Sequence, residues 1–155
     1  MRRKERQVTN PAEIRAVIDR CKVLRLGLNA AGAPYIVPMN FGWEMTDGLP
    51  VFYLHCANEG RKIDLLRADP RVGFEMDGAH GLREGQTPCA YSYFYESVVG
   101  SGEITFLKDA AEKARALERI LLHQAGRKIS VSPEQGEAVT VLRLRPDALS
   151  CKRNP

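Results

Sequence analysis

The chain has 155 residues, of which 23 are lysine or arginine and 19 are aspartate or glutamate, giving a formal net charge of +4. This length predicts a single domain over residues 1-155 with a buried core of ordinary size. The apolar runs are no longer than a strand, which excludes a transmembrane helix. No apolar segment follows the charged residues 1–6, so we expect a cytoplasmic protein.

The excess positive charge lies mainly at the two ends of the sequence. Residues 2–6 and the pair Lys152 and Arg153 are interpreted as basic N- and C-terminal tails. Nucleic-acid binding through residues 2–6 is an alternative, but no nucleic-acid motif is found and acidic residues are spread through the body. The four cysteines form no C-x-x-C pair and the three histidines lie far apart, so no metal site is expected.

Two segments have the pattern of an amphipathic helix. In the first, Asn10 is a typical N-cap, Pro11 suits the first helical position, and the apolar stripe runs to residue 21. The second is predicted from Asp109, with Glu112 three residues later, to Gly126. The first helix is expected to lie on a sheet or to cover the end of a barrel, and the second is expected to have a packing role.

Most of the remaining chain alternates apolar and polar residues with the period of a strand. The predicted strands cover residues 24–28, 35–43, 51–56, 71–77, 91–106 and 138–145. Residues 78–88 contain three glycines and are expected to form an irregular loop. The meander order without βαβ alternation predicts a mainly β fold with peripheral helices, a barrel of about six antiparallel strands.

Pro38 lies in the middle of the predicted strand 35–43. Because proline has no backbone N–H, it does not suit a strand paired on both sides. A twisted edge strand explains it most simply. The alternatives are a bulge, or a place where something other than a strand contacts the backbone.

The stretch 54–66 is the best candidate for a ligand site. A strand leads into a short helix that Pro70 ends, so Arg61 and Lys62 fall in the first helical turn. Cations are unusual there, because the free N–H groups make a helix start electropositive. With Gly60 allowing close backbone approach, these groups predict a phosphate site. A solvated helix start, with Glu59 satisfying the dipole, is the alternative.

These segments together resemble a known family. The quoted segments are N-P-A-E-I, P-Y-I-V-P-M-N-F-G, H-C-A-N-E-G-R-K-I-D-L-L, D-P-R-V-G-F-E-M-D and T-P-C-A-Y-S followed by S-V-V-G-S-G-E-I. Over residues 1 to 150 they resemble the pyridoxamine 5′-phosphate oxidase-like flavoproteins, and within these the 5-nitroimidazole antibiotic resistance proteins. The G-R-K-I-D-L-L unit is the most specific part of the match.

The resemblance implies an FMN-binding split barrel, a homodimer with flavin at the subunit interface. Arg61 and Lys62 match the pair that holds the FMN phosphate, and Gly60 stands where the oxidases carry a serine. The strand that lies along the flavin ring is matched by Val37, Pro38, Met39 and Asn40. Ser97 occupies the position of a glutamine that contacts the flavin in the oxidases.

The C-terminal end departs from the oxidases. They carry an arginine and a histidine there that grip pyridoxamine phosphate, whereas this chain ends in Leu149-Ser150-Cys151-Lys152-Arg153-Asn154-Pro155. Pyridoxamine-phosphate oxidase activity is therefore not expected. The resistance branch carries a glycine before its terminal lysine where this chain has Cys151, so Lys152 is not assigned as a ligand.

The resemblance implies flavin redox chemistry, in which the protein needs few acid–base residues. His55 is the candidate catalytic residue, because it precedes the phosphate turn and could donate a proton to a bound substrate. Its alternative is a partly buried histidine bonded to a backbone carbonyl. We expect an FMN-dependent reductase of small oxidised molecules such as nitroaromatics, with NAD(P)H bound transiently. A non-catalytic flavin- or haem-binding protein is the second hypothesis.

Overall fold

The computed structural model describes residues 3–155, and its strands form one antiparallel sheet. The strand order is β1-β7-β4-β3-β2-β5-β6, and β6 also pairs with β7, so β2 to β7 close into a barrel. The bounds are β1 (Gln7–Val8), β2 (Val23–Leu28), β3 (Tyr35–Thr46), β4 (Leu49–Cys56), β5 (Arg71–Arg83), β6 (Ser92–Phe106) and β7 (Thr140–Asn154). The predicted split barrel of about six antiparallel strands is confirmed.

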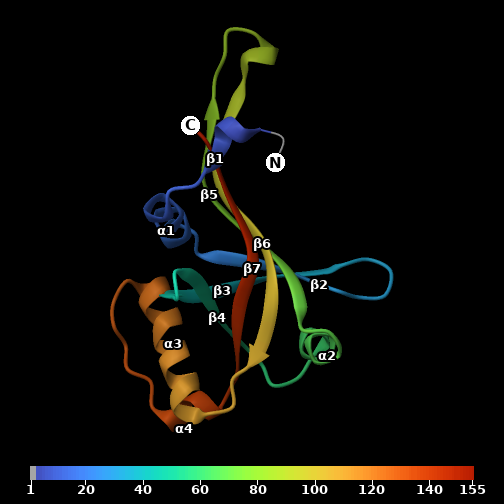
Figure 1. The fold of residues 1–155 in the computed structure, drawn as a ribbon, viewed down its shortest axis with the longest axis vertical. Helices are drawn as coiled ribbons and strands as arrows, with labels where there is room; N and C mark the ends of the chain where they lie inside the picture. Colours follow the sequence, from blue (N-terminus) through green and yellow to red (C-terminus); the bar gives the residue numbers. More distant parts are fainter. Residues whose placement is uncertain (1–2) are drawn as a thin grey trace.

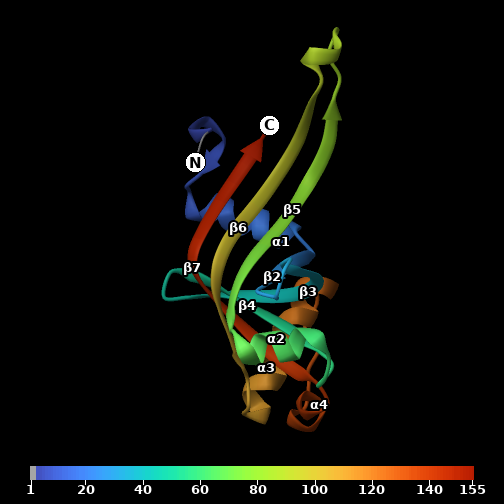
Figure 2. The same cartoon turned by 90° about the vertical axis from the view of Figure 1, so that its right-hand side faces the viewer.

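The barrel is built from two groups of strands. Figure 1 shows β2, β3 and β4 running across the direction of the long strands β5, β6 and β7. The end of the β5–β6 hairpin extends far beyond the barrel, as both Figure 1 and Figure 2 show. Residues 78–83 of the expected loop therefore belong to β5, and only residues 84–91 connect the two strands.

The barrel interior is filled by the inward side chains of all six strands. Phe52 is fully buried, and its ring centroid lies 5.8 Å from that of Phe41 and 5.4 Å from that of Phe74. The other fully buried side chains include Leu24, Leu26, Leu28, Leu54, Met76, Leu142 and Leu144. This contiguous apolar cluster fixes which face of each strand points outward.

The α-helices of the described residues lie outside the barrel, and they are α1 (Pro11–Arg20), α2 (Arg61–Ala68), α3 (Ala110–Ala125) and α4 (Pro133–Glu137). The predicted caps are confirmed. The Asn10 side chain accepts a hydrogen bond from the Ala12 N–H at 2.9 Å, and Asp109 accepts one from the Glu112 N–H at 2.8 Å. Each cap satisfies one backbone donor that the helix itself leaves free.

Helix α3 packs directly on the backbone of β3. A β-carbon at Gly42 would lie 2.3 Å from the backbone carbonyl carbon of Arg119, which no real side chain could do. Gly42 thus sets the distance at which α3 covers the outer face of β3 and β4. The outer face of residues 35–40 is not covered in this way.

The expected basic C-terminal tail is a strand instead. Cys151 is buried in the core, and Lys152 and Arg153 pair with β6 as part of β7. At the other end, Met1 and Arg2 of the expected N-terminal tail lie outside the described residues. Residues 4–6 form a short 3₁₀ helix, and β1 pairs with the end of β7.

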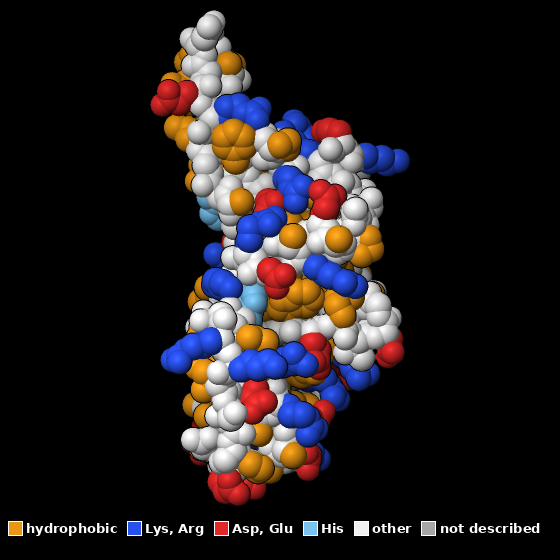
Figure 3. All heavy atoms as spheres, turned by 90° about the vertical axis from the view of Figure 1, so that its left-hand side faces the viewer, with side chains coloured by type: hydrophobic (Ala, Val, Ile, Leu, Met, Phe, Trp, Pro, Cys, Tyr) orange, Lys and Arg blue, Asp and Glu red, His pale blue; other side chains and the backbone are white. Residues whose placement is uncertain are grey.

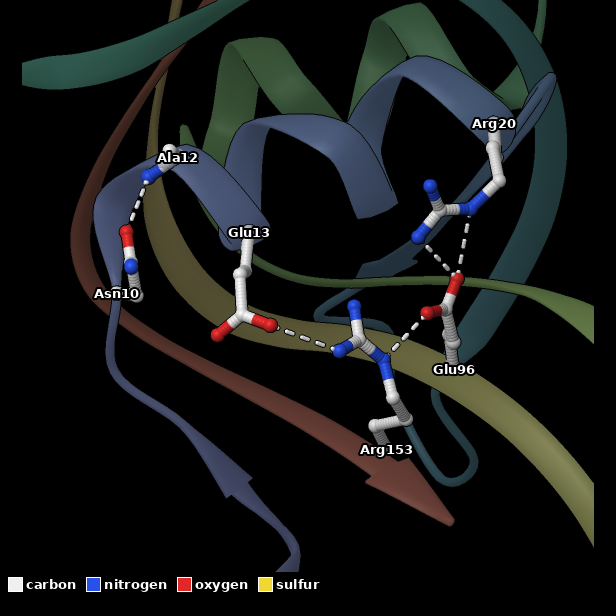
Figure 4. A network of polar contacts seen from close by, with 6 residues as sticks. All are labelled: Asn10, Ala12, Glu13, Arg20, Glu96 and Arg153. Carbon is white, nitrogen blue, oxygen red and sulfur yellow. Dashed lines mark hydrogen bonds and ion pairs between the residues drawn. The ribbon is translucent and has the colours of Figure 1, made fainter. Parts of the chain in front are cut away.

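A polar network fastens α1 to the end of β7, as Figure 4 shows. The buried carboxylate of Glu96 on β6 accepts hydrogen bonds from Arg20 of α1 at 2.6 Å and 2.8 Å, and from Arg153 of β7 at 2.6 Å. Arg153 also donates to Glu13 at 2.9 Å. The last strand is therefore held by charged groups as well as by backbone pairing.

Candidate functional site

Strand β3 changes its pairing partner at Phe41. Residues 35–40 pair with β2, whereas residues 41–46 pair with β4. Over residues 35–40 the second edge of β3 has no strand partner within the described chain, and Pro38 lies in this half. The prediction that Pro38 does not sit on a fully paired strand is confirmed.

The four predicted residues on this half of β3 divide between its two faces. Val37 and Met39 turn toward the barrel interior, whereas Pro38 and Asn40 are exposed. The Asn40 side chain already donates to the backbone oxygen of Lys22 at 3.1 Å and to Gln124 at 3.2 Å. The free backbone edge is therefore the main feature that this strand offers to a ligand.

Helix α2 begins beside this edge with an open first turn. Gly60 has φ +123°, a conformation that L side chains rarely adopt, and no atom lies within 4 Å of the place where its β-carbon would be. The N–H groups of Ile63 and Asp64 donate to the Gly60 oxygen at 2.8 Å and 3.2 Å. The preceding N–H groups, of Arg61 and Lys62, are those that a helix leaves without an internal acceptor.

The two cations of this turn form no ion pair with any residue from 3 to 155. The guanidinium carbon of Arg61 lies 4.7 Å from the centre of the Tyr35 ring at the start of β3. Lys62 is half-buried, and its charge acts on Cys56 at the end of β4. Burial raises the pKa of the Cys56 thiol, and Lys62 opposes this shift.

Asn58 holds the turn between β4 and α2, a role that the sequence analysis did not assign. Its side chain accepts a hydrogen bond from the Thr140 hydroxyl at 2.9 Å and donates to the Ala138 oxygen at 3.4 Å. Asparagine directly after a strand is typical of such turns, so its residue type was the available signal. The start of β7 thereby fixes the position of Gly60.

His55 lies on the outer face of β4, opposite Val141 of β7. Its neighbour Leu54 points into the barrel, and His55 itself is exposed. It makes no hydrogen bond to a described residue, so it is not the carbonyl-bonded, partly buried histidine of the alternative interpretation. It stands five residues before Gly60, which precedes the first residue of α2.

Ser97 is not brought next to these groups within one chain. It lies on β6 opposite Asp77 and Lys152, and β2 and β5 separate β6 from β3. On the other path round the barrel, β7 and β4 lie between them. The structure thus joins the start of α2 to the start of β3 through Arg61 and Tyr35, and leaves Ser97 on the opposite side of the barrel.

Two surface cavities of about 480 Å³ and 520 Å³ lie elsewhere, along α3. Both are lined by Glu44 and Arg119, which form an ion pair at 2.9 Å. Tyr53 donates to Glu44 at 2.6 Å, and burial together with this carboxylate raises the pKa of Tyr53 to about 12. Figure 3 shows positive and negative side chains interspersed over this side of the molecule.

Among residues 3–155, no group of three histidine, cysteine or acidic side chains could hold a metal ion. The helices of the same part of the chain are all too short or too polar to cross a membrane.

Comparisons with known proteins agree with this architecture. A proposed 5-nitroimidazole antibiotic resistance protein from Bacteroides thetaiotaomicron is 30% identical, with a TM-score of 0.81 over 95% of this chain and 86% of that chain. The flavocytochrome Anf3 from Azotobacter vinelandii is 22% identical, with a TM-score of 0.75 over 94% of this chain and 68% of that one. The FAD and haem binding protein from Mycobacterium smegmatis is 17% identical, with a TM-score of 0.78 over 96% and 73%.

No curated protein matches the chain in sequence. The sequence profile of the family described as pyridoxamine 5′-phosphate oxidase matches residues 10–153, which include every predicted site residue. The chain therefore belongs to the pyridoxamine 5′-phosphate oxidase family.

Proposed function

We propose that this chain is a cytoplasmic FMN-dependent oxidoreductase that reduces small oxidised molecules, with nitroaromatics such as 5-nitroimidazoles as the candidate substrates. One observation carries the proposal. Within residues 3–155, Arg61 and Lys62 form no ion pair at the open start of α2, and the nearby edge of β3 has no strand partner. The chain also belongs to a family named for an oxidase.

The groups at α2 fit a phosphate. One turn brings together two cationic side chains, free backbone N–H groups and a residue without a side chain. Each of these features favours the binding of a dianion. Tyr35 fixes the direction of Arg61 through the 4.7 Å contact. In this proposal Gly60, Arg61 and Lys62 hold the FMN phosphate.

The edge of β3 fits the flavin ring. The flavin ring is a planar heterocycle with oxygen and nitrogen atoms along its rim. These atoms can accept hydrogen bonds from, and donate hydrogen bonds to, the backbone of a strand edge that has no strand partner among the described residues. Val37, Pro38, Met39 and Asn40 supply this edge. The ring supplies the redox chemistry, while the protein positions it and controls access of water and substrate.

We further propose that two copies form a homodimer with a flavin at each side of their interface. Ser97 lies across the barrel from β3 within one chain, so a single copy does not bring all the predicted contacts together. A second copy in a two-fold arrangement can place its own Ser97 at the site.

His55 is the proposed proton donor to the substrate as it is reduced. The side chain is exposed at the end of β4, so a substrate can reach it without a rearrangement of the barrel. NAD(P)H is the proposed electron donor, bound transiently at the flavin. Replacing His55 with glutamine is expected to lower the rate of nitroimidazole reduction and to leave the affinity for FMN unchanged.

A non-catalytic flavin- or haem-binding protein is the second candidate. It is favoured by the small number of acid–base groups near α2 and by the names of two similar structures, a flavocytochrome and a FAD and haem binding protein. Under this alternative the purified protein carries a cofactor but turns over no acceptor.

An absorbance spectrum of the purified protein and a titration with FMN test the proposal. Flavin bands, or stoichiometric FMN uptake, support it, and a colourless protein that takes up no FMN contradicts it. Reduction of 5-nitroimidazoles by NADH or NADPH in the presence of the FMN-loaded protein then separates the reductase from the non-catalytic alternative.

A further inference from the structure

The cavity of about 480 Å³ along α3 has no part in the proposed function. Its walls come from α3, from the end of β3, from the middle of β4 and from residues 128–130 of the connection between α3 and α4. Figure 1 shows this connection running beside α3, from the end of the helix back toward its start. We call this space the α3 cavity.

The connection that forms the outer wall is fixed along its length. At Gly126, where φ is +69°, the backbone N–H bonds back to the last turn of α3. At the other end, Ser132 and Gln135 form a capping box that starts α4. Between these points the Val131 N–H donates to the Glu118 carboxylate of α3 at 3.0 Å. The wall is therefore in place before any ligand arrives, as is usual for small-molecule sites.

The carboxylates of the α3 cavity are all engaged by other groups of the protein. Glu44 accepts a hydrogen bond from the Tyr53 hydroxyl at 2.6 Å and forms an ion pair with Arg119 at 2.9 Å. Glu112 forms an ion pair with Arg143 of β7 at 2.7 Å. The third carboxylate is the acceptor of the wall N–H described above. A cationic ligand would have to compete with these partners.

Two cations of the same wall are not engaged in this way. Arg115 of α3 and Lys128 of the connection form no ion pair with any of residues 3–155. Together with Arg119 and Arg143, four cations lie at or behind the wall against three carboxylates. The excess charge is positive, so the α3 cavity favours an anion.

An unused hydrogen-bond donor lies behind the wall. Arg143 stands opposite Tyr53 in the pairing of β4 with β7. Its Nε is buried, and it has no hydrogen-bond partner among residues 3–155. A buried donor left in this state costs free energy and adds to the positive potential under the cavity. A negative group in the cavity offsets that potential.

The size and the rest of the lining suit an organic molecule. Leu122, Ile129 and Ala116 add apolar surface to the wall, and Tyr53 adds an aromatic ring. Small-molecule sites have volumes of about 300 to 1,000 Å³, whereas one water molecule takes about 30 Å³. An inorganic ion would leave most of the α3 cavity to water.

We propose that the α3 cavity binds a small organic anion, a molecule with an apolar body and one carboxylate or phosphate group. Arg115 and Lys128 receive the anionic group, while Leu122 and Ile129 contact the body of the ligand. The carboxylates of the wall keep their present partners.

The proposed anion site is separate from the start of α2. Helix α3 packs on β3 at Gly42, in the half of the strand that pairs with β4. Arg61 of α2 contacts Tyr35, at the opposite end of β3. The binding of an anion in the α3 cavity therefore does not depend on the proposed flavin function.

Three probes with the same ring test the need for negative charge. Benzoate carries a carboxylate, phenyl phosphate a phosphate group, and benzamide a neutral amide. NMR titration of the isotope-labelled full chain should give saturable shifts of the backbone amides of α3 and of residues 126–131 with the anions. The anion that binds more tightly identifies the anionic group of the ligand. Equal affinity for benzamide would overturn the proposal.

Two single substitutions test the cations. Arg115→Ala and Lys128→Ala should each weaken the binding of the tighter anion roughly three- to tenfold. Arg127→Ala is the matched control, because Arg127 is an exposed cation next to Lys128 that does not line the cavity. This control should bind like the unchanged chain. Equal affinities for all four proteins would contradict the assignment of the two cations.

Ser130→Phe tests the space and leaves every charge in place. Ser130 is exposed and lines the α3 cavity, so a phenyl group at this position fills part of the volume from the connection. Binding of the anion should be lost, while urea denaturation should show an unchanged free energy of unfolding. Unchanged anion affinity in this variant would show that the anion binds elsewhere.

The positions of the shifted amides decide between this site and the start of α2. Shifts confined to residues 58–66 would place the probes at α2 and overturn the α3 cavity as their site. Sodium sulfate is the inorganic probe. If sulfate moves the same α3 amides with the same affinity as the organic anions, the organic part of the proposal fails. A chain that binds no FMN but binds benzoate or phenyl phosphate at α3 would refute the proposed function and support this inference.

Discussion

The guanidinium of Arg61, the first residue of α2, lies 4.7 Å from the ring of Tyr35, the first residue of β3. This contact joins two segments that the sequence separates by a hairpin and a turn. It holds the cation close to the β3 edge, so that the proposed phosphate contact and ring contact are parts of one site. The predictions for the site follow from it.

Replacing Arg61 or Lys62 with alanine is expected to weaken FMN binding by about 1.5 to 3 kcal/mol each, the range for hydrogen bonds to charged groups. Neither side chain is paired within residues 3–155, so removing it breaks no ion pair of the fold. Quenching of FMN fluorescence on titration with protein measures the change.

The matched control for these variants is Arg67→Ala. Arg67 is an exposed cation in the last turn of the same helix, so its removal changes the net charge equally but lies away from Gly60. Its FMN affinity should stay near that of the unchanged chain. Equal FMN affinities for the unchanged chain and the three variants would show that the start of α2 is an ordinary solvated helix turn.

Tyr35→Phe and Tyr35→Ala separate the ring from the hydroxyl. A phenylalanine keeps the cation–π contact with Arg61, so FMN affinity should be retained. Alanine removes it and should cost about 0.5 to 2 kcal/mol of FMN binding free energy. If phenylalanine were as harmful as alanine, the hydroxyl rather than the ring would be the important group.

The sequence predicts the local features well, because their causes are local. Asn10 and Asp109 cap their helices through residues two and three positions away, and the pattern of caps is visible in the chain. Pro38 identifies the half of β3 that pairs with a neighbouring strand along one edge, because its missing N–H is a property of the residue alone. The start of a helix after Gly60 is predicted from local residues in the same way, and α2 does begin at Arg61.

The features that were missed depend on contacts between distant segments. Lys152 and Arg153 looked like a tail because they are basic, yet pairing with β6 and the carboxylate of Glu96 draws them into β7. The glycines of residues 78–88 suggested a loop, whereas backbone pairing with β6 extends β5 to Arg83. The opposite location of Ser97 follows from strand order, which no single segment encodes.

Gly60→Ala should weaken FMN binding through the backbone alone. The added β-carbon would meet no atom within 4 Å, but φ at +123° is strained for alanine, at a cost of about 1 to 3 kcal/mol. The turn should relax, moving the N–H groups of α2 away from the phosphate. Gly27→Ala is the control, since Gly27 has ordinary strand geometry and its β-carbon would lie 3.7 Å from the nearest atom.

Gly42→Ala is expected to destabilise the fold and to act on the site only indirectly. Its β-carbon would fall 2.3 Å from the Arg119 backbone, so α3 must move away from β3, which typically costs about 1 to 3 kcal/mol or more. Urea denaturation should show a lower free energy of unfolding. Gly73→Ala, whose β-carbon would lie 3.9 Å from the nearest atom, should change it little. A Gly42→Ala protein as stable as the unchanged chain would contradict this packing of α3.

The network at Glu96 predicts how stability depends on pH. Burial alone would raise the pKa of Glu96, but hydrogen bonds from Arg20 and Arg153 lower it below its ordinary value of 4.5. The folded state therefore favours the charged form. The charged carboxylate of Glu96 therefore stabilises the folded state fully above pH 4.5. This stabilisation is lost as the pH falls through the lowered pKa of Glu96.

Glu96→Gln should therefore lower the free energy of unfolding at neutral pH by about 1.5 to 3 kcal/mol, because the hydrogen bonds from Arg20 and Arg153 lose their charged acceptor. The difference in unfolding free energy between this variant and the unchanged chain should narrow as the pH falls below 4.5. The reason is that the carboxylate of Glu96 then becomes protonated in the unfolded and the folded state. Glu103→Gln, an exposed glutamate on the same strand with no ion pair to residues 3–155, is the control. Urea denaturation from pH 3 to pH 7 measures all three proteins, and a gap that stayed constant over this range would show that the charge of Glu96 does not hold α1 to β7.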